Sequence, residues 1–296
     1  MSLPPDDHTH SEWSWDAVQG SMEGSCARAV ALGLPSIAFT EHVDLVRWHV
    51  PPERQAAMRR GEFGPVAVKM TRFIGADDRF SPPRIDVDGY LESIDRCRAK
   101  FPGLRIVTGV ELGEPHWYAE ESKALLATGA FERVLGSLHS IAVEEGLNEV
   151  GRAFQTLVER GAPADEVVRS YLSHLLQMVE SCDLFAVLAH VDYAARRYPT
   201  QPGAYDAGRF EEEFRAVLRA LAQSGRALEV NTRLPLDARV VRWWHEVGGD
   251  AVTFASDAHL PDAVGHGFAE AAAMVEAQGF RPGARPYDFW TRGLTR

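Results

Sequence analysis

Histidine and acidic side chains that could bind a metal ion occur in closely spaced pairs near both ends of the chain. His8 and His10 stand one residue apart in DDHTHSEWSWD, and Asp257 and His259 have the same spacing in SDAH. In an extended strand, residues i and i+2 point to the same side, so each pair can contact one ion. Imidazole and carboxylate groups are ligands of catalytic zinc, manganese and iron. Either pair alone is a weak indication, because an isolated histidine at a strand end is more often a capping or packing residue.

Apolar runs that are typical of strands precede Asp257 and other potential ligands later in the chain. The runs cover residues 36–40, 105–110, 133–138, 184–189, 227–231 and 251–256. Amphipathic stretches that predict helices alternate with them, at residues 16–33, 86–100, 164–181, 207–224 and 262–279. The alternation predicts an α/β fold in which crossover helices connect parallel strands. Because the runs are continuously apolar, we expect strands buried on both faces, as in a barrel or a doubly wound sheet.

Potential ligands stand where these expected strands end. They are Glu41, His42, Glu111, His139, His190, Asp257 and His259. His8 and His10 fit a short opening strand before the first long helix. In a parallel barrel the carboxyl ends of all strands meet on one face, where active sites lie. Histidine, aspartate or glutamate at the ends of several strands is unlikely to arise by chance, so we predict a metal site built from distant parts of the chain.

Short motifs around these residues form a known series. HTH, FTEH, GVELG, GSLHS, AHVD and SDAH occur in this order, and the series resembles that of the PHP (polymerase and histidinol phosphatase) superfamily over residues 7 to about 280. Within the superfamily the chain is most similar to the histidinol-phosphate phosphatase branch. The resemblance implies a distorted (β/α)7 TIM-like barrel of the PHP type. We therefore expect a single domain over residues 1–296, with a long loop insertion at about 43–85.

The resemblance also implies a site for two to three divalent ions, which would be zinc, manganese or iron. The first ion would take His8, His10, Glu111 and Asp257, the second would share Glu111 and add His139 and His190, and the third would take Asp16, His42 and His259. In several relatives a histidine stands in the place of Asp16. Asp16 could instead cap the helix expected after it, because aspartate is a favoured N-cap residue.

Such a site predicts a phosphomonoesterase in which a hydroxide bridging two metals attacks phosphorus. Asp257, His42 and His259 are the candidates for handling the proton that the leaving group needs. Arginine can make bidentate hydrogen bonds to phosphate oxygens, and Arg196, Arg197 and Arg233 are the candidates for this role. His116 is a further candidate for the wall of the substrate pocket. GSLHS is not a GxSxG nucleophile elbow, so a covalent serine mechanism is disfavoured.

L-histidinol phosphate is the substrate that the resemblance favours, and several alternatives stay open. The segment NTRLPL departs from the relatives, in which Ser-Gly often follows Asn-Thr, and this leaves the leaving group in question. Another small phosphate ester or a nucleotide would use the same metals. A deaminase or amidase of the amidohydrolase type is less favoured, because none of the strand-end runs ends in lysine. A non-catalytic metal-binding PHP module is disfavoured by the nearly complete ligand set.

Composition limits the kind of partner and compartment. The net charge of −11 argues against binding to a nucleic acid polymer. Cys26, Cys97 and Cys182 are far apart and show no CxxC spacing, which favours a reducing compartment. Neither a secretion signal nor a long apolar span is visible, so we expect a cytoplasmic protein without membrane association. The expected partner is a small phosphorylated substrate, and the oligomeric state is left open.

Overall fold

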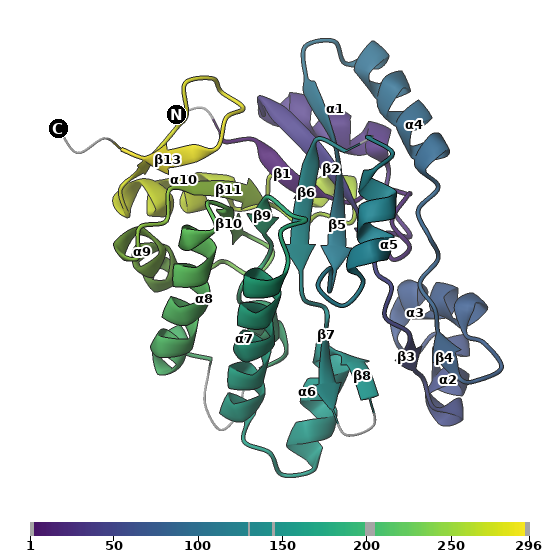
Figure 1. Ribbon diagram of the computed structural model, residues 1–296. Helices are drawn as coiled ribbons and strands as arrows, with labels where there is room; N and C mark the ends of the chain where they lie inside the picture. The colour runs from purple at the N-terminus through teal and green to yellow at the C-terminus, as the bar shows by residue number, and fades with distance from the viewer. Residues whose placement is uncertain (1–2, 130, 144–145, 199–204, 294–296) are drawn as a thin grey trace.

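The computed structural model describes residues 3–129, 131–143, 146–198 and 205–293. Within these ranges, parallel strands alternate with helices along the chain (Figure 1). In the main sheet, seven strands that follow one another along the chain pair in parallel, as the apolar runs predict. In chain order these strands are β1 (Asp6–Thr9), β2 (Ser36–Val43), β5 (Arg105–Gly113), β6 (Arg133–Ser137), β9 (Val187–Leu188), β10 (Ala227–Asn231) and β11 (Ala251–Ala255).

The first and last of these parallel strands meet and close the sheet. The backbone N–H of Asp257 donates to the carbonyl of His8 at 2.9 Å, and the N–H of His10 donates to that of Ala258 at 2.8 Å. The described residues therefore form a barrel of seven parallel strands, which confirms the expected α/β fold of (β/α)7 type. The barrel is distorted, since β9 spans only two residues and an antiparallel pair, β12 (Phe280–Arg281) and β13 (Trp290–Arg292), extends the sheet beyond β11.

Helices pack around the strands. They are α1 (Met22–Leu32), α4 (Val87–Lys100), α5 (Ala119–Leu126), α6 (Val150–Glu159), α7 (Ala164–Ser181), α8 (Glu211–Gln223), α9 (Ala238–Glu246) and α10 (Phe268–Ala277). Short 3₁₀ turns η2 (Tyr193–Arg197), η3 (Ala207–Phe210) and η4 (Pro261–Ala263) connect some of them. In α7, Val168, Leu172, Leu175 and Val179 recur at helical spacing and are buried in the core between strands and helices. The amphipathic stretches thus provide the outer layer of the barrel.

The cap of α1 decides one of the open alternatives. Its N-cap is Ser21, whose side chain accepts a hydrogen bond from the N–H of Gly24 at 3.1 Å. Asp16 lies well before this helix and does not cap it, so the helix-cap interpretation of Asp16 is wrong. The stretch from residue 16 onward was expected to be helical, but the helix begins only at Met22.

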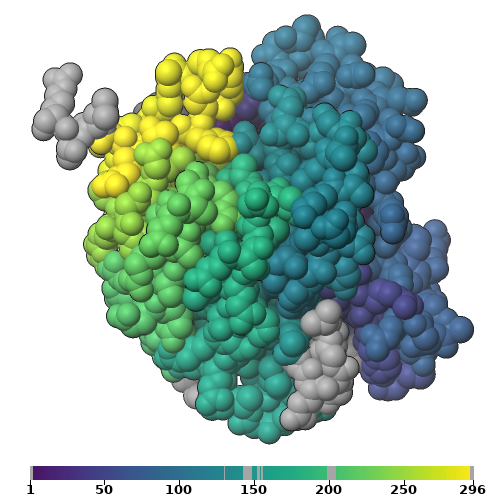
Figure 2. Space-filling model, in the orientation of Figure 1, coloured from purple at the N-terminus to yellow at the C-terminus, as the bar shows by residue number. Residues whose placement is uncertain are grey.

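The insertion at 43–85 was expected to be a long loop, and it contains regular structure instead. It holds β3 (Trp48–His49), α2 (Pro52–Arg59), α3 (Gly64–Met70), η1 (Thr71–Phe73) and β4 (Arg79–Phe80). Proline suggested a loop, yet here it stands in the first turn of α2 and of α3, where a missing N–H costs nothing. A small apolar cluster that includes Val46, Trp48, Met58 and Phe80 holds the segment together. It projects from the barrel as the blue lobe at the lower right of Figure 2.

The polar segment 140–163 also contains regular structure. It begins with the hairpin of β7 (Ser140–Val143) and β8 (Gly146–Glu149) and continues into α6. In Figure 1 the arrowheads of β5 and β6 point toward the end of the barrel at which this hairpin and α2–α3 lie. Both additions therefore extend the face formed by the carboxyl ends of the strands. Within the described ranges, no helix has the length and apolar character that a membrane span requires.

Candidate metal centre

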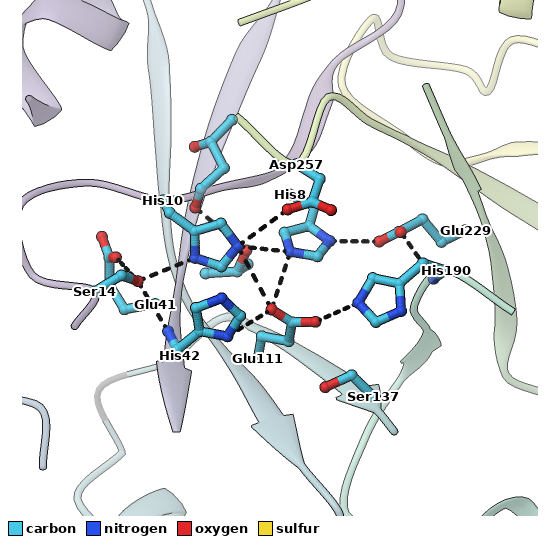
Figure 3. A network of polar contacts seen from close by, with 12 residues as sticks. His8, His10, Ser14, Glu41, His42, Glu111, Ser137, His190, Glu229 and Asp257 are labelled. Carbon is cyan, nitrogen blue, oxygen red and sulfur yellow. Dashed lines mark hydrogen bonds and ion pairs between the residues drawn. The ribbon is translucent and has the colours of Figure 1, made fainter. Parts of the chain in front are cut away.

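The carboxylate of Glu111, which is buried in β5, lies at the centre of a group of imidazoles (Figure 3). The nitrogens near its Oε2 are His8 Nε2 at 3.2 Å, His10 Nε2 at 3.5 Å and His42 Nδ1 at 3.0 Å; those near its Oε1 are His139 Nε2 at 3.2 Å and His190 Nε2 at 2.7 Å. These five histidines come from four different strands or strand ends, those of β1, β2, β6 and β9, as the sequence predicts. A carboxylate between two sets of imidazoles has the arrangement that can bridge two cations.

Asp16 and Asp257 extend the group in two directions. Asp257 Oδ1 lies 3.5 Å from His10 Nε2. Asp16 Oδ2 lies 3.0 Å from His259 Nε2 and 3.4 Å from His42 Nε2. The imidazole of His42 therefore stands between Glu111 and Asp16. All nine residues expected to be metal ligands thus lie in one continuous cluster, and the three expected for a third ion are adjacent to one another.

The protons of His8 and His10 can be placed from their outer partners. His8 Nδ1 lies 2.7 Å from Glu229 Oε2, so it carries the hydrogen that it donates to this carboxylate. The Ser14 hydroxyl donates to Glu41 Oε2 at 2.6 Å, so it can only accept from His10 Nδ1, which lies 3.0 Å away. When neutral, both rings therefore have a bare lone pair on Nε2.

These two lone pairs face each other at close range. His8 Nε2 and His10 Nε2 are 3.0 Å apart, and both are directed at the Glu111 carboxylate (Figure 3). Such a concentration of acceptors without a donor is unfavourable in a buried site. A divalent cation bound by both imidazoles and by Glu111 would remove the repulsion, so the donor set fits a metal ion.

Asp44 orients His139 in the same way. Its Oδ1 lies 2.8 Å from His139 Nδ1, which leaves Nε2 free to face Glu111. A carboxylate behind a metal-binding imidazole fixes the tautomer and makes the ring a stronger ligand. Glu229 and Asp44 were not among the residues predicted from the sequence to belong to the site. The signal for Glu229 was present, because it is a charged residue in the middle of the apolar run ALEVN.

The backbone is strained at two of the proposed ligands. Asp257 has a φ of 51° and His190 a φ of 20°, both in the region that non-glycine residues rarely adopt. Residues held in such conformations cluster at functional sites.

The carbonyl of Asp257 also lies 2.9 Å from His259 Nδ1, which orients that ring toward Asp16.

Burial and mutual attraction control the charges in the cluster. Burial opposes ionisation of Glu111, but the nearby His8, His42 and His139 outweigh it and hold the pKa of this carboxyl well below its usual range. Burial lowers the pKa of each of these histidines, but neighbouring carboxylates outweigh it and raise each pKa well above its usual value. These carboxylates are Glu229 and Glu111 for His8, Asp16 and Glu111 for His42, and Glu111 and Asp44 for His139. Burial and repulsion by His42 lower the pKa of His10. Metal ions would compete with protons for the imidazoles, so we expect binding to release protons.

A cavity of about 770 Å³ opens beside the cluster. Asp16, His42, His139, His190, Asp257 and His259 line it, together with Arg196, Arg197 and Arg233. Arg196 Nη2 lies 2.8 Å from Asp257 Oδ2, and Arg233 Nη1 lies 3.3 Å from Asp257 Oδ1. The three arginines that the sequence suggested therefore stand at the same cavity as the proposed ligands.

His116 does not line this cavity, contrary to the expectation. A tight turn after β5, in which the N–H of Trp117 donates to the carbonyl of Glu114 at 2.9 Å, places its ring against Trp117, with 4.8 Å between ring centroids. Burial and the nearby His174 lower the pKa of His116 to about 4. A packing role fits this position better than contact with a substrate.

Curated relatives of similar length carry a shared name. The histidinol-phosphatase of Lactococcus lactis subsp. lactis is 25% identical over 283 residues, which cover 93% of this chain and 91% of that protein. The probable histidinol-phosphatase of Clostridium acetobutylicum is 26% identical over 208 residues, which cover 67% of this chain and 76% of that protein.

Two solved structures have the same fold. One is the histidinol phosphate phosphatase of Lactococcus lactis complexed with zinc, L-histidinol and phosphate, with a TM-score of 0.71, 22% identity, and coverage of 94% of this chain and 95% of that one. The other is the putative histidinol phosphatase of Listeria monocytogenes, with a TM-score of 0.70, 17% identity, and coverage of 90% and 99%. The family model described as the PHP domain matches residues 6–233. The chain therefore belongs to the PHP domain family.

Proposed function

We propose that this protein is a metal-dependent phosphomonoesterase that hydrolyses L-histidinol phosphate to L-histidinol and phosphate. The observation that carries the proposal is the placement of His8 and His10, whose Nε2 atoms both face Glu111 in a cluster that lies beside an arginine-lined cavity. The substrate is suggested by the names of the relatives, one of which matches 93% of this chain.

The metal assignment that we propose follows the three groups in the cluster. His8, His10, Glu111 and Asp257 would hold one ion, Glu111, His139 and His190 a second, and Asp16, His42 and His259 a third. When bound, divalent ions supply positive charge for the phosphate oxygens and lower the pKa of a bound water. Mixed imidazole and carboxylate ligands accept zinc, manganese or iron.

The arginines would bind and orient the phosphate. Arg196 is mostly buried, and one of its nitrogens is held by Asp257 while its Nε has no hydrogen-bond partner among the described residues. Arg197 and Arg233 are more exposed and stand nearer the solvent. A guanidinium presents paired donors that match phosphate oxygens, which a lysine does not.

The leaving alcohol must gain a proton as its bond to phosphorus breaks. Asp257, His42 and His259 line the cavity and are the groups that we propose to hold or deliver it. When the third ion is absent, the carboxylate of Asp16 can stabilise the ring of His259 or His42 in its protonated form. A bound third ion would occupy the nitrogens that carry this proton. No lysine is among the described residues that line the cavity, which disfavours chemistry of the amidohydrolase type.

We further propose that the protein works in the cytoplasm on a small phosphorylated substrate, and not on a nucleic acid polymer or at a membrane. Its three cysteines are free and buried, as a reducing compartment favours. The net charge of −11 disfavours binding to a polyanion.

Phosphate release from several esters tests the proposal. The purified protein, with its metal content measured, is assayed with L-histidinol phosphate, glycerol 3-phosphate and adenosine 5′-monophosphate. We expect L-histidinol phosphate to have the highest kcat/KM. A higher value for another ester would overturn the substrate assignment, and metal-replete protein that releases phosphate from none of them would overturn the phosphatase proposal. The size of the cavity also admits a nucleotide, which is why this arm is included.

A further inference from the structure

We propose that the insertion formed by β3, α2 and α3 is the leaving-group subsite, and that it selects phosphomonoesters whose alcohol carries a planar ring. This inference rests on the proposed phosphatase function. It adds to it a specificity role for a segment that contributes none of the proposed metal ligands.

The walls of the cavity differ in chemistry. One side carries the proposed metal ligands and the guanidinium groups of Arg196, Arg197 and Arg233. The other side comes from the insertion and is mostly apolar, with Trp48, Val50, Met58, Phe63, Val66 and Met70 among its residues. His49 and Arg54 are its polar members, and the Arg54 guanidinium packs over the Phe63 ring at 4.6 Å from the centroid. The phosphate of an ester finds more hydrogen-bond donors on the ligand side, where three arginines stand, than against the mostly apolar insertion. The phosphate therefore faces the ligand side, and the alcohol faces the insertion.

Trp15 connects the two sides. Its ring centroid lies 6.1 Å from that of the proposed ligand His42 and 5.9 Å from that of Trp48. Its Nε1 donates to Asp44 Oδ2 at 2.8 Å, and the other oxygen of Asp44 holds His139. The apolar wall thus begins about one ring away from the metal cluster, at a distance that a compact alcohol attached to a bound phosphate can reach.

The wall is held rigidly. Trp48 stacks on Phe80 with 5.4 Å between centroids and an interplanar angle of 7°, and its Nε1 donates to Ser140 Oγ at 2.8 Å. These contacts tie the insertion to the β7–β8 hairpin. A preformed wall gives up little conformational entropy when a ligand binds, so contact with a ring translates into affinity.

A planar ring fits this wall better than a small polyhydroxy group does. Aromatic rings gain from burial against tryptophan and from offset or edge contacts. The flexible thioethers of Met58 and Met70 can adapt to the outline of a ring. The hydroxyl groups of a glycerol ester would lose water against the tryptophan, valine and methionine side chains, which offer them no hydrogen bonds. The wall therefore raises the affinity for ring-bearing alcohols relative to polyhydroxy alcohols.

Helix α3 offers a matched pair of positions for a test. Val66 lines the cavity and is partly exposed, so it contributes little to the core of the insertion. Val68, two residues further along the same helix, is 38% exposed and does not line the cavity. Met70 is a second, partly exposed position on the cavity wall. Serine at these sites removes apolar contact while keeping a small side chain.

The experiment compares Val66→Ser and Met70→Ser with the control Val68→Ser in the metal-replete enzyme. With L-histidinol phosphate we expect Val66→Ser and Met70→Ser to lower kcat/KM by about tenfold, chiefly through KM. With glycerol 3-phosphate we expect values within about twofold of the wild type, and Val68→Ser should change neither ester. Equal losses for both esters, or an effect of Val66→Ser no larger than that of Val68→Ser, would overturn the subsite.

Two further measurements separate this inference from the proposed function. Quenching of tryptophan fluorescence by L-histidinol reports occupancy of the wall without turnover, and we expect Val66→Ser to weaken it while Val68→Ser does not. Unchanged quenching in Val66→Ser would count against the subsite. A higher kcat/KM for adenosine 5′-monophosphate than for L-histidinol phosphate would overturn the histidinol phosphate assignment. The subsite would still be supported if Val66→Ser and Met70→Ser lower kcat/KM for adenosine 5′-monophosphate but not for glycerol 3-phosphate. Wild-type preference for glycerol 3-phosphate over both ring-bearing esters would overturn the subsite while leaving the enzyme a phosphatase.

Discussion

Glu229 in β10 accepts a hydrogen bond from His8 Nδ1 in β1 at 2.7 Å, although the two residues are 221 positions apart in the sequence. The carboxylate is held in turn by the side chain of Asn231 and by the backbone N–H of His190. It therefore fixes the ring of one proposed ligand and the backbone of another. This contact can exist only when the barrel is closed, so folding and assembly of the metal site are coupled.

Replacing Glu229 with glutamine should weaken metal binding without removing a ligand. Glutamine keeps the shape and can still accept the His8 hydrogen, but it loses the negative charge that makes the imidazole a strong ligand. We expect metal affinity to fall about 10- to 100-fold, as is usual for partners behind metal-binding histidines. Competition with a chromogenic chelator measures the change. Glu132→Gln, at a half-exposed surface position, is the control, and wild-type affinity in Glu229→Gln would contradict the role of this carboxylate.

Asp16→Asn tests the proposed third ion. The amide lacks the charge that faces His42 and His259, so we expect the metal content to fall by one equivalent while the other ions remain. Elemental analysis after dialysis against a defined metal concentration gives the stoichiometry. An unchanged stoichiometry would show that Asp16 is not a metal ligand.

Ser21→Ala should lower stability and leave the metal content unchanged, in contrast to Asp16→Asn. Ser21 caps α1, and loss of such a cap costs about 1 kcal/mol of stability. We therefore expect a lower free energy of unfolding in urea and an unaltered metal content. A loss of metal in this variant would contradict this expectation, because it would show that the cap of α1 is needed to hold Asp16 in place.

Removal of metal should destabilise the whole barrel. The proposed ligands come from strands at both ends of the sequence and meet around one buried carboxylate, Glu111. An ion that binds only the folded state at 100 times its dissociation constant adds about 2.7 kcal/mol. We expect chelation to lower the Tm and re-addition of metal to restore it. The same Tm with and without chelator would show that these residues hold no ion in solution.

The strand ends could be predicted from the sequence because most of the proposed ligands follow an apolar run, and the carboxyl ends of parallel strands lie on one face. His42, Glu111 and His139 are where that argument puts them, although β2 and β5 extend further than the apolar runs and include their ligands. The barrel order followed from the same alternation. These features depend on local patterns that recur along the chain.

Other features depend on contacts between distant segments and escaped this reasoning. Asp44 follows a ligand motif by two residues, and only the fold shows that it orients His139. The prolines of α2 and α3 suggested a loop because their helix-starting role appears only once the following turn packs on Trp48 and Phe80. His116 lies close to Glu111 in sequence, but the turn after β5 places it against Trp117.

Phosphate release from L-histidinol phosphate by metal-free and metal-reconstituted protein, in the wild type and in His139→Ala, tests the central claim most directly. We predict negligible release without metal, recovery on addition of zinc, manganese or iron, and little recovery in His139→Ala despite a retained fold by circular dichroism. Equal release with and without metal, or a wild-type rate in His139→Ala, would contradict the account.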